Sequence, residues 1–206
     1  LGPDCLAGLG RPGHASHKGS QGDVLVIGGA PGMRGAALLA ARAALAAGAG
    51  RVYACPLGMQ GDELDAGRPE LMLWREASLD QAATWADKTI VAGCGGGSAI
   101  RASLLLALRQ AERLVLDADA LNAIAADELL RRLLSARRQP NLLTPHPLEA
   151  ARLLNLTTAA VQADRLGAAQ ALAEALACTV ILKGSGSVIA APGRLPCINS
   201  SGNAAL

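Results

Sequence analysis

Aromatic side chains are almost absent from this chain of 206 residues, which contains no Phe, one Tyr and two Trp. Proteins that bind single-stranded nucleic acid stack the bases on such side chains. The net charge of +2 adds no strong attraction for a phosphate backbone. The composition therefore argues against a nucleic-acid-binding protein. The sequence also lacks an apolar run long enough to span a bilayer, and the basic-then-apolar pattern of a signal peptide.

Closely spaced cysteines are lacking as well. The five cysteines are scattered and form no C-x-x-C pair for zinc or redox chemistry: Cys5, Cys55, Cys94, Cys178 and Cys197. An odd number of dispersed thiols in a chain of this size predicts a reduced, cytoplasmic compartment. His14 and His17 have no acidic neighbour in the sequence, so we do not predict a metal site from them.

What the chain does have is 51% hydrophobic residues, enough to bury one good core. Short apolar runs alternate with helix-forming stretches, an order typical of a parallel sheet with crossover helices. We predict a single α/β domain over residues 1–206. Residues 1–16, whose first part is rich in Gly and Pro, are interpreted as a flexible arm. The chain begins with Leu1 rather than Met, which is compatible with a piece of a longer product.

The pattern of a strand, a glycine-rich loop and a helix occurs twice. Residues 24–27 predict a buried strand, 28–35 a glycine loop and 36–47 an Ala- and Leu-rich helix packed on the sheet. Residues 89–92 predict another strand, and the glycines of 93–98 again precede a helix. Both loops should lie at the carboxyl ends of parallel strands, where open α/β sheets bind ligands. Together they favour a nucleotide site. The glycine spacing of the first loop matches neither the dinucleotide fingerprint nor the P-loop, and alone that loop is equally consistent with a tight turn.

Other segments complete the predicted sheet and its helices. Further strands are expected at residues 51–55, 114–116, 141–143, 179–182, 188–190 and 195–198, and amphipathic helices at 127–138 and 158–176. The helix at 127–138 should expose four arginines to solvent: Arg131, Arg132, Arg137 and Arg138. We interpret them as a solvated helix face rather than a nucleic-acid-binding patch.

Polar side chains follow three of the predicted strands. Asp117, Asp119 and Asn122 come after the strand at 114–116, where carboxylates suit Mg²⁺, a water-mediated phosphate contact or a substrate hydroxyl. For Asp119 the alternative is a cap on the helix that follows.

A rigid corner and a hairpin follow the next two strands. Prolines on both sides of His146 hold the backbone extended and then start a helix, so that Thr144, His146 and Glu149 should project from one corner. An imidazole beside a carboxylate can donate to a substrate or shuttle a proton near neutral pH. The hairpin at 183–187 carries a cation and two hydroxyls, which suit a phosphate or a purine edge, although turn geometry alone also explains such residues.

In combination these segments resemble the ADP- or ATP-dependent NAD(P)H-hydrate dehydratase family, a branch of the ribokinase-like superfamily often labelled "carbohydrate kinase". The resemblance covers nearly the whole chain in order and rests on His17-Lys18-Gly19-Ser20, Val26-Ile27-Gly28-Gly29, Gly32-Met33-Arg34-Gly35-Ala36-Ala37, Asp117-Ala118-Asp119-Ala120-Leu121-Asn122, Thr144-Pro145-His146-Pro147-Leu148-Glu149 and Lys183-Gly184-Ser185-Gly186. It implies a three-layer ribokinase-like α/β fold with a mostly parallel central sheet flanked by helices.

The resemblance also implies a repair lyase. Such an enzyme removes water from hydrated NADH or NADPH and consumes ADP or ATP, with Mg²⁺, in a homo-oligomer. The substrate would contact Ala36, Gly97 and His146, supported by Asp117, Asp119 and Asn122. Glu149 would reach Mg²⁺ through water. The nucleotide would lie on the hairpin Lys183, Gly184, Ser185, Gly186 and Ser187.

The sequence departs from the family pattern at its end and at one loop. The family continues into Gly-Thr-Gly-Asp, whose Asp is the base, whereas this chain stops at Leu206; we expect the 206 residues alone to be inactive. Cys94 replaces the usual Pro. His146 replaces the Asn of related vitamin kinases and favours the dehydratase. A small-molecule kinase and a non-catalytic nucleotide-binding module remain alternatives, and the choices between ADP and ATP and between the two hydrates stay open, as does a preceding epimerase domain.

Overall fold

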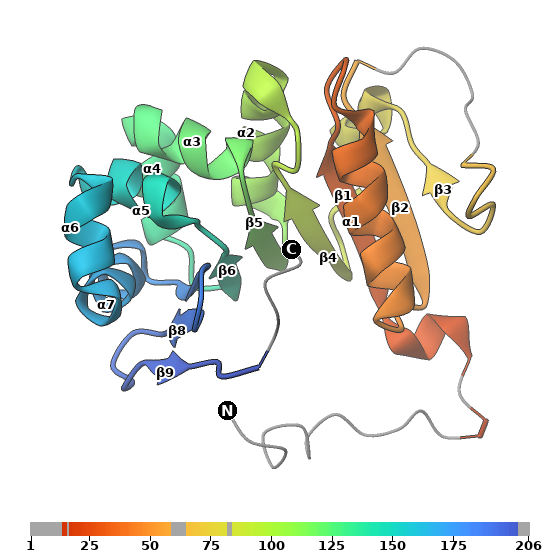
Figure 1. The fold of residues 1–206 in the computed structure, drawn as a ribbon. Coiled ribbons are helices and arrows are strands. Elements are labelled where there is room, and N and C mark those ends of the chain that lie inside the picture. The colour runs from red at the N-terminus through yellow and green to blue at the C-terminus, as the bar shows by residue number, and fades with distance from the viewer. Residues whose placement is uncertain (1–13, 16, 59–64, 82–83, 202–206) are drawn as a thin grey trace.

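The computed structural model describes residues 14–15, 17–58, 65–81 and 84–201, so most of the predicted arm, 1–16, lies outside the described residues. Within this part the chain forms a nine-stranded sheet in the order β3-β2-β1-β4-β5-β6-β7-β8-β9 (Figure 1). Its strands are β1 (Asp23–Gly28), β2 (Arg51–Pro56), β3 (Met72–Leu73), β4 (Lys88–Ala92), β5 (Arg113–Leu116), β6 (Asn141–Leu143), β7 (Thr179–Leu182), β8 (Val188–Ala190) and β9 (Cys197–Ile198). Pairing is parallel from β3 to β7 and antiparallel from β7 to β9. The expected mostly parallel sheet is confirmed.

Helices cover both faces of this sheet. They are α1 (Arg34–Ala46), α2 (Ile100–Gln110), α3 (Asp119–Ala126), α4 (Glu128–Ser135), α5 (Pro147–Leu154), α6 (Thr158–Ala163) and α7 (Arg165–Leu176), with short 3-10 turns η2 (Lys18–Gln21), η3 (Glu76–Asp80) and η5 (Gly97–Ala99). Helix α1 lies on one face against β1 and β2, whereas α2, α3, α5 and α7 belong to the layer on the opposite face (Figure 1). None of the described helices is long and apolar enough to cross a membrane.

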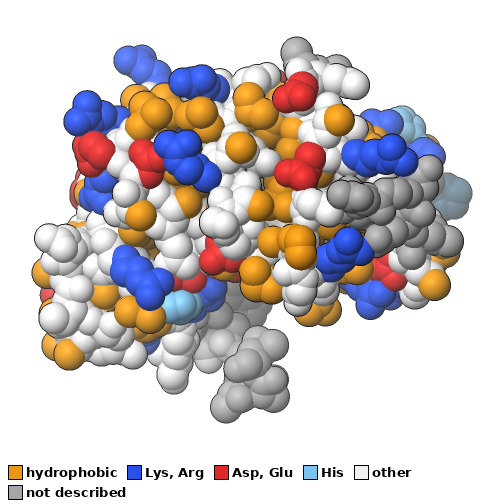
Figure 2. Space-filling model, turned by 90° about the horizontal axis from the view of Figure 1, so that it is seen from above, with side chains coloured by type: hydrophobic (Ala, Val, Ile, Leu, Met, Phe, Trp, Pro, Cys, Tyr) orange, Lys and Arg blue, Asp and Glu red, His pale blue; other side chains and the backbone are white. Residues whose placement is uncertain are grey.

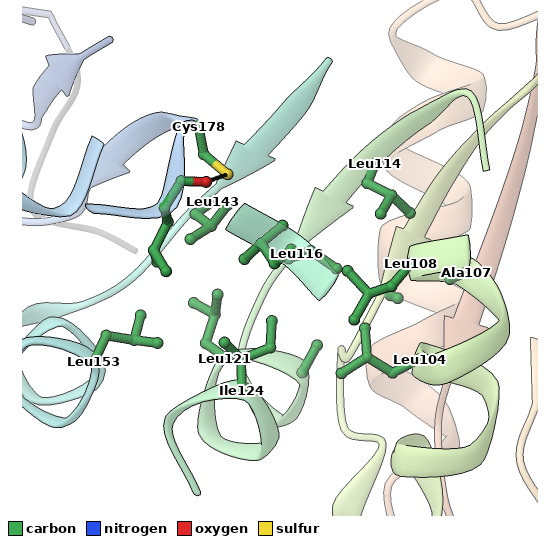
Figure 3. Close-up of a cluster of buried hydrophobic side chains, with 14 of the residues drawn as sticks. Leu104, Ala107, Leu108, Leu114, Leu116, Leu121, Ile124, Leu143, Leu153 and Cys178 are labelled. Atoms are coloured by element: carbon green, nitrogen blue, oxygen red, sulfur yellow. Dashed lines mark hydrogen bonds between the residues drawn. The ribbon is translucent and has the colours of Figure 1, made fainter. Parts of the chain in front are cut away.

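Alternation along the strands divides the core between the two faces. In β1, Leu25 and Ile27 face the larger cluster, whereas Val24 and Val26 face α1. The larger cluster joins strand residues such as Leu116 and Leu143 to leucines of α2, α3 and α5 (Figure 3). Successive strand side chains point to opposite faces, and a sheet buried on both sides therefore reads as a continuous apolar run. This is why the short apolar runs predicted the strands correctly.

The face of the sheet that packs against α1 is less completely buried on the strands that lie beyond this helix. On β5 to β8 it carries Val115, Leu142, Ile181 and Ile189, which are only half-buried, although their neighbours on the opposite face are fully buried. Residues 69–71 lead into β3, which pairs with β2 and forms one edge of the sheet.

Two local predictions are wrong. The helix expected over 158–176 is broken at Asp164, whose backbone leaves the helical region with φ −139° and ψ 79°. The Asp164 carboxylate accepts a hydrogen bond from the Gly167 N–H and thereby caps the start of α7. A short acidic side chain competes with a continuing helix in this way, because it offers the backbone N–H groups another partner.

The second correction concerns Arg137, which was expected in solvent but is buried. Its guanidinium donates to the carbonyl oxygens of Leu108 (2.6 Å) and Ala111 (2.6 Å) and to Asn141 Oδ1 (2.7 Å). These carbonyls end α2, where helix oxygens lack partners and attract a cation. Burial lowers the pKa of Arg137 from its ordinary value. The role of this side chain is structural, because it caps the carboxyl end of α2.

Candidate active site

The two glycine loops lie against each other at the carboxyl edge of the sheet, as predicted. The Gly29 N–H donates to the Cys94 carbonyl oxygen (2.9 Å) and the Ala30 N–H to that of Gly95 (2.7 Å). A Cβ atom added to Gly28 would lie 2.4 Å from the Cys94 oxygen. Only glycine permits this approach, so the close packing of the two loops explains its presence here.

The same edge continues through the loops after β5, β6 and β7. Each loop donates a backbone hydrogen bond to its neighbour: Asp117 N–H to Ala92 O (3.1 Å), Thr144 N–H to Leu116 O (3.1 Å) and Lys183 N–H to Pro145 O (2.8 Å). In parallel sheets these ends lie side by side and form the usual ligand-binding edge. The bonds therefore align the predicted site segments along one rigid rim.

Asp119 holds the second glycine loop rather than capping α3. Its carboxylate accepts a hydrogen bond from the Gly97 N–H (2.8 Å), and Asp119 is itself the first residue of α3. The N-cap position is Ala118, with φ +48°, and it forms no side-chain cap. The capping alternative for Asp119 is thus wrong, because its side chain is used to fix the loop that carries Gly97.

Ala36 and Gly97 lie in the adjoining parts of the two loops. A Cβ atom on Gly97 would lie 3.5 Å from Met33 Cε, and one on Gly95 would lie 2.9 Å from Ala36 Cβ. Ala36 is half-buried in the first turn of α1. The predicted substrate contacts Ala36 and Gly97 therefore occupy one part of the rim.

A cavity of about 610 Å³ opens beside this part of the rim. Its lining includes Gly97, Asp119 and Asn122 and extends to Arg101 and Asp127. Figure 2 looks down on the molecule from above and shows acidic side chains among hydrophobic ones in the middle of this face, with Lys and Arg mostly toward its margins. Three of the predicted site residues therefore border one cavity of a size suited to a small ligand.

Asn122 is held by a residue that the sequence did not reveal. Arg152 of α5 donates from Nη1 to Asn122 Oδ1 at 2.5 Å. The bond joins α3 to α5 and leaves the amide NH₂ group of Asn122 as the donor for other partners. Arg152 and Asn122 are 30 residues apart. No local pattern predicts a contact across that distance.

His146 and Glu149 form a reciprocal cap at the start of α5. His146 Nδ1 accepts hydrogen bonds from the N–H groups of Leu148 (3.1 Å) and Glu149 (3.4 Å), and Glu149 Oε2 accepts from the His146 N–H (2.8 Å). His146 Nε2 lies 3.2 Å from Glu149 Oε1. Because Nδ1 accepts, the ring proton of a neutral His146 lies on Nε2.

Glu149 is almost fully buried, with 4% of its side chain exposed, and both of its oxygens face His146. Direct ligation of Mg²⁺ does not fit this carboxylate, which leaves a link through water. Among the described residues no group of three or more His, Cys, Asp or Glu side chains could hold a metal ion. A bound Mg²⁺ would need most of its ligands from elsewhere, such as phosphate oxygens and water.

Lys183 reaches from the hairpin to the loop after β5. Its Nζ atom lies 2.7 Å from Asp117 Oδ1, and both side chains remain partly exposed. Cys94 lies in the same neighbourhood, and burial, followed by the charge of Asp117, raises the pKa of its thiol. Cys94 therefore stays protonated at neutral pH and offers no thiolate nucleophile.

The fold defines a class before any relative is considered: an α/β protein with a mostly parallel sheet, whose glycine-rich and polar loops line the carboxyl ends of the strands. A solved ribokinase-like superfamily protein from Enterococcus faecalis superposes with a TM-score of 0.83 over 98% of this chain and 72% of that one, at 24% identity. This likeness establishes the ribokinase-like fold.

The family follows from the sequence comparison. The carbohydrate-kinase model described as NAD(P)H-hydrate dehydratase matches residues 24–206, and the chain belongs to that family. The ADP-dependent (S)-NAD(P)H-hydrate dehydratase of Neisseria meningitidis is 43% identical over 93% of this chain and 65% of its own length. The bifunctional NAD(P)H-hydrate repair enzyme of Moorella thermoacetica is 40% identical over 97% of this chain and 40% of its own length.

A solved relative has been captured with a nucleotide. The ADP/ATP-dependent NAD(P)H-hydrate dehydratase of Bacillus subtilis, co-crystallised with ATP and Mg²⁺, superposes with a TM-score of 0.74 at 27% identity. The alignment covers 94% of this chain and 69% of that one. Of the two curated relatives, from Neisseria meningitidis and Moorella thermoacetica, the chain spans less than two thirds of the length.

Proposed function

We propose that this chain carries the substrate and nucleotide sites of an ADP- or ATP-dependent NAD(P)H-hydrate dehydratase. The reaction would remove water from the hydrated nicotinamide ring and restore NADH or NADPH. The observation that supports this most strongly is the Lys183–Asp117 contact, 2.7 Å between Nζ and Oδ1, which joins the hairpin to the rim beside the other site residues. A nucleotide on the hairpin would thereby lie beside a substrate in the glycine loops.

The roles of the residues follow their places on the rim. Ala36 and Gly97 would let the hydrated ring approach the backbone, because neither carries a bulky side chain. His146 would donate its Nε2 proton to the substrate when the ring turns from Glu149. The hairpin, Lys183 to Ser187, would hold the nucleotide with one cation, two hydroxyls and backbone N–H groups of its glycines. Asp117, Asp119 and Asn122 would keep this arrangement in place.

The chemistry explains why a kinase-like scaffold suits a dehydratase. A ring hydroxyl is a poor leaving group, whereas a phosphate ester leaves easily. Transfer of a phosphoryl group from the nucleotide to the hydroxyl would therefore permit elimination. In that step the C–O bond and a C–H bond on the neighbouring ring carbon would break, the ring double bond would form, phosphate would leave and the proton would pass to a base. Mg²⁺ would supply charge neutralisation for the phosphates. Lys183 would contribute a fixed positive charge on the protein side.

The proposed activity is tested by recovery of NADH absorbance from purified hydrated NADH with Mg²⁺ and either ADP or ATP. We would compare the 206-residue chain with one extended past Leu206, each with nucleotide omitted as a control. Recovery that needs nucleotide and occurs only in the extended chain supports both the dehydratase and the expectation that these 206 residues lack the base. Turnover by the 206 residues alone refutes that expectation.

Absence of recovery from both chains would contradict the dehydratase. Phosphorylation of a small alcohol in a screen with ATP would then favour a small-molecule kinase. Thermal stabilisation by ADP without any turnover would favour a nucleotide-binding module. Light scattering on the same samples tests the expected homo-oligomer.

A further inference from the structure

Arg165, the first residue of α7, lies against the carbonyl side of the hairpin after β7. Its guanidinium donates from Nη1 to the Ser185 oxygen (2.5 Å) and from Nη2 to the oxygens of Leu182 (3.2 Å) and Lys183 (3.3 Å). One side chain thus binds three carbonyl groups of a single turn. A planar guanidinium fits such a set because its donors are fixed in a fork.

The place of Arg165 in its own helix does not explain its presence. A helix N-terminus carries partial positive charge and disfavours a cation. Asp164 already caps α7 by accepting from Gly167, so the helix start needs no further partner. The helix break at Asp164, which the sequence did not predict, brings Arg165 to the hairpin.

Gly184 is matched to the guanidinium. Its φ is +143°, and a Cβ atom at this position would lie 2.8 Å from Arg165 Nη2 and 3.2 Å from Cζ. Both the backbone conformation and the lack of space therefore call for glycine. The packing of Arg165 on Gly184 is thus a second observation, independent of the hydrogen bonds.

The bonds to Arg165 also orient the opposite side of each peptide. In a trans peptide the C=O and the following N–H point in opposite directions. Leu182 gives an internal check, because its oxygen faces Arg165 while the next N–H, that of Lys183, donates to Pro145 O at 2.8 Å. By the same geometry the N–H groups after the Lys183 and Ser185 carbonyls, those of Gly184 and Gly186, point away from α7.

These two N–H groups donate no hydrogen bond to another part of the chain that the structure describes. Adjacent backbone N–H groups in a glycine-rich turn form a concave site for acceptor atoms, above all those of anions. Lys183, at the start of the same turn, adds a positive charge. The turn is therefore prepared for the acceptor atoms of a nucleotide, either phosphate oxygens or base nitrogens.

We propose that Arg165 is a positioning residue that holds the carbonyls of the hairpin and thereby aims the Gly184 and Gly186 N–H groups at the bound nucleotide. This inference rests on the proposed function for its ligand, whereas the brace itself is a property of the chain. Arg165 does not touch the ligand. It acts through the backbone of the turn.

The test compares Arg165→Met, Arg165→Lys and, as a matched control, Arg194→Met, which removes an exposed arginine from the turn between β8 and β9. Hydrogen exchange measures the hairpin without any ligand. In Arg165→Met we expect exchange of the Lys183 and Asn199 amides, which donate hydrogen bonds to Pro145 O and Ser187 O at the two ends of the hairpin, to rise about tenfold or more. The amides within β5 and β6 should stay unchanged. Arg165→Lys should recover part of the protection, and Arg194→Met should match the parent chain.

The second measurement is of nucleotide binding and turnover. It uses the polypeptide that is active in the NADH-recovery assay. Arg165→Met should raise the Kd and KM for ADP about tenfold or more, with kcat at saturating ADP changed less than about threefold. Equal losses for adenosine and ADP would assign the acceptors to the base, and a loss for ADP alone would assign them to the phosphates.

Two outcomes overturn the proposal. One is unchanged hairpin exchange in Arg165→Met. The other is faster exchange with unchanged ADP affinity, which would leave Arg165 a purely structural brace. If the parent chain binds no nucleotide, the proposed function and the ligand part of this inference both fail. Faster hairpin exchange in Arg165→Met would then still demonstrate the brace, so the two failures are distinguishable.

Discussion

The ammonium group of Lys183 lies 2.7 Å from the carboxylate of Asp117, although 66 residues of chain separate them. The contact passes over β6 and joins the hairpin after β7 to the loop after β5. Both side chains are partly exposed, at 41% and 28%. An exposed pair of this kind contributes little to folding, about 0 to 1 kcal/mol. Its position beside the other site residues points instead to ligand binding.

Replacement of Lys183 should therefore affect nucleotide binding more than stability. We expect Lys183→Met to weaken ADP binding about 10- to 100-fold, because a charged hydrogen bond to phosphate is lost. The melting temperature should change by less than about 3 °C. Calorimetric titration with ADP measures the effect, and Asp117→Asn, which retains the lysine, should bind more tightly than Lys183→Met. Unchanged ADP affinity in Lys183→Met would contradict the assignment of the hairpin.

Arg137 presents the opposite case, a buried cation with a structural role. Arg137→Met should destabilise the protein by about 2 to 3 kcal/mol, because the last carbonyls of α2 and the Asn141 side chain lose a charged donor. Urea unfolding measures the change. Arg138→Met is the matched control: this neighbouring side chain is exposed and its removal should cost less than about 0.5 kcal/mol. Equal effects of the two substitutions would show that Arg137 does not cap α2.

The difference between Arg137 and Arg138 also shows where sequence reasoning stops. Short apolar runs determine the buried strands, and glycine or proline after each run marks the loops, so the sheet, most helices and the rim were predictable. The carbonyl groups of Leu108 and Ala111 that Arg137 binds lie 29 and 26 residues away, at the end of α2. Nothing in the local pattern around Arg137 distinguishes it from an arginine on a wet helix face.

The candidate site divides in the same way. Its residue types and their order after the strands identified Asp117, Asp119 and His146 as neighbours on one rim. The partner of each side chain was not predictable: Asp119 could cap α3 or hold the Gly97 loop, and only packing decides between them. Arg165 was missed because the sequence favours an unbroken helix through Asp164, and the break depends on one carboxylate bonding the Gly167 N–H.

Asp127 gives a pH-dependent prediction. Its carboxylate accepts from Arg101 and from the first N–H groups of α4, and the Arg101 hydrogen bond is the main cause that holds the pKa of Asp127 below its ordinary value. A depressed folded-state pKa stabilises the protein above the unfolded pKa, about 3.9, and this stabilisation is lost as pH falls through the folded value.

The test compares Asp127→Asn with Asp127→Ala at about pH 6 and about pH 3. Asn keeps a side-chain cap but loses the charge, so its deficit in unfolding free energy against the parent chain should shrink at the lower pH. Ala loses the cap as well and should remain less stable than Asn at both values. A deficit of Asn that stays constant between the two pH values would refute the role of the ionised carboxylate.

Leu142 and Leu143 are adjacent in β6 but face opposite sides of the sheet. Leu143 is fully buried in the larger cluster, whereas Leu142 is half-buried on the α1 face (Figure 3 shows Leu143). Leu143→Ala should cost about 2 to 5 kcal/mol, and Leu142→Ala about 1 kcal/mol. Strand propensity changes equally in the two variants, so the difference reports burial alone. Similar costs in urea unfolding would mean that the α1 face of β6 is covered in solution.

His146 allows the structural and chemical roles of one side chain to be separated. Its Nδ1 atom caps α5, a task that Asn also performs well, whereas the Nε2 proton beside Glu149 has no equivalent in Asn. We expect His146→Asn to retain stability within about 0.5 kcal/mol of the parent chain, and His146→Ala to lose about 1 kcal/mol. Thermal unfolding measures both changes.

Turnover decides the chemical role. If His146 donates to the hydrated nucleotide, His146→Asn should lower kcat/KM for hydrated NADH about tenfold or more, although the cap and the fold are intact. ADP binding should be unaffected, because the hairpin is tied to this corner through the Pro145 oxygen and not through the imidazole. Full activity in His146→Asn would make the imidazole a helix cap and nothing more. His146 would then no longer be an argument for a dehydratase over the related vitamin kinases, which have Asn at this position.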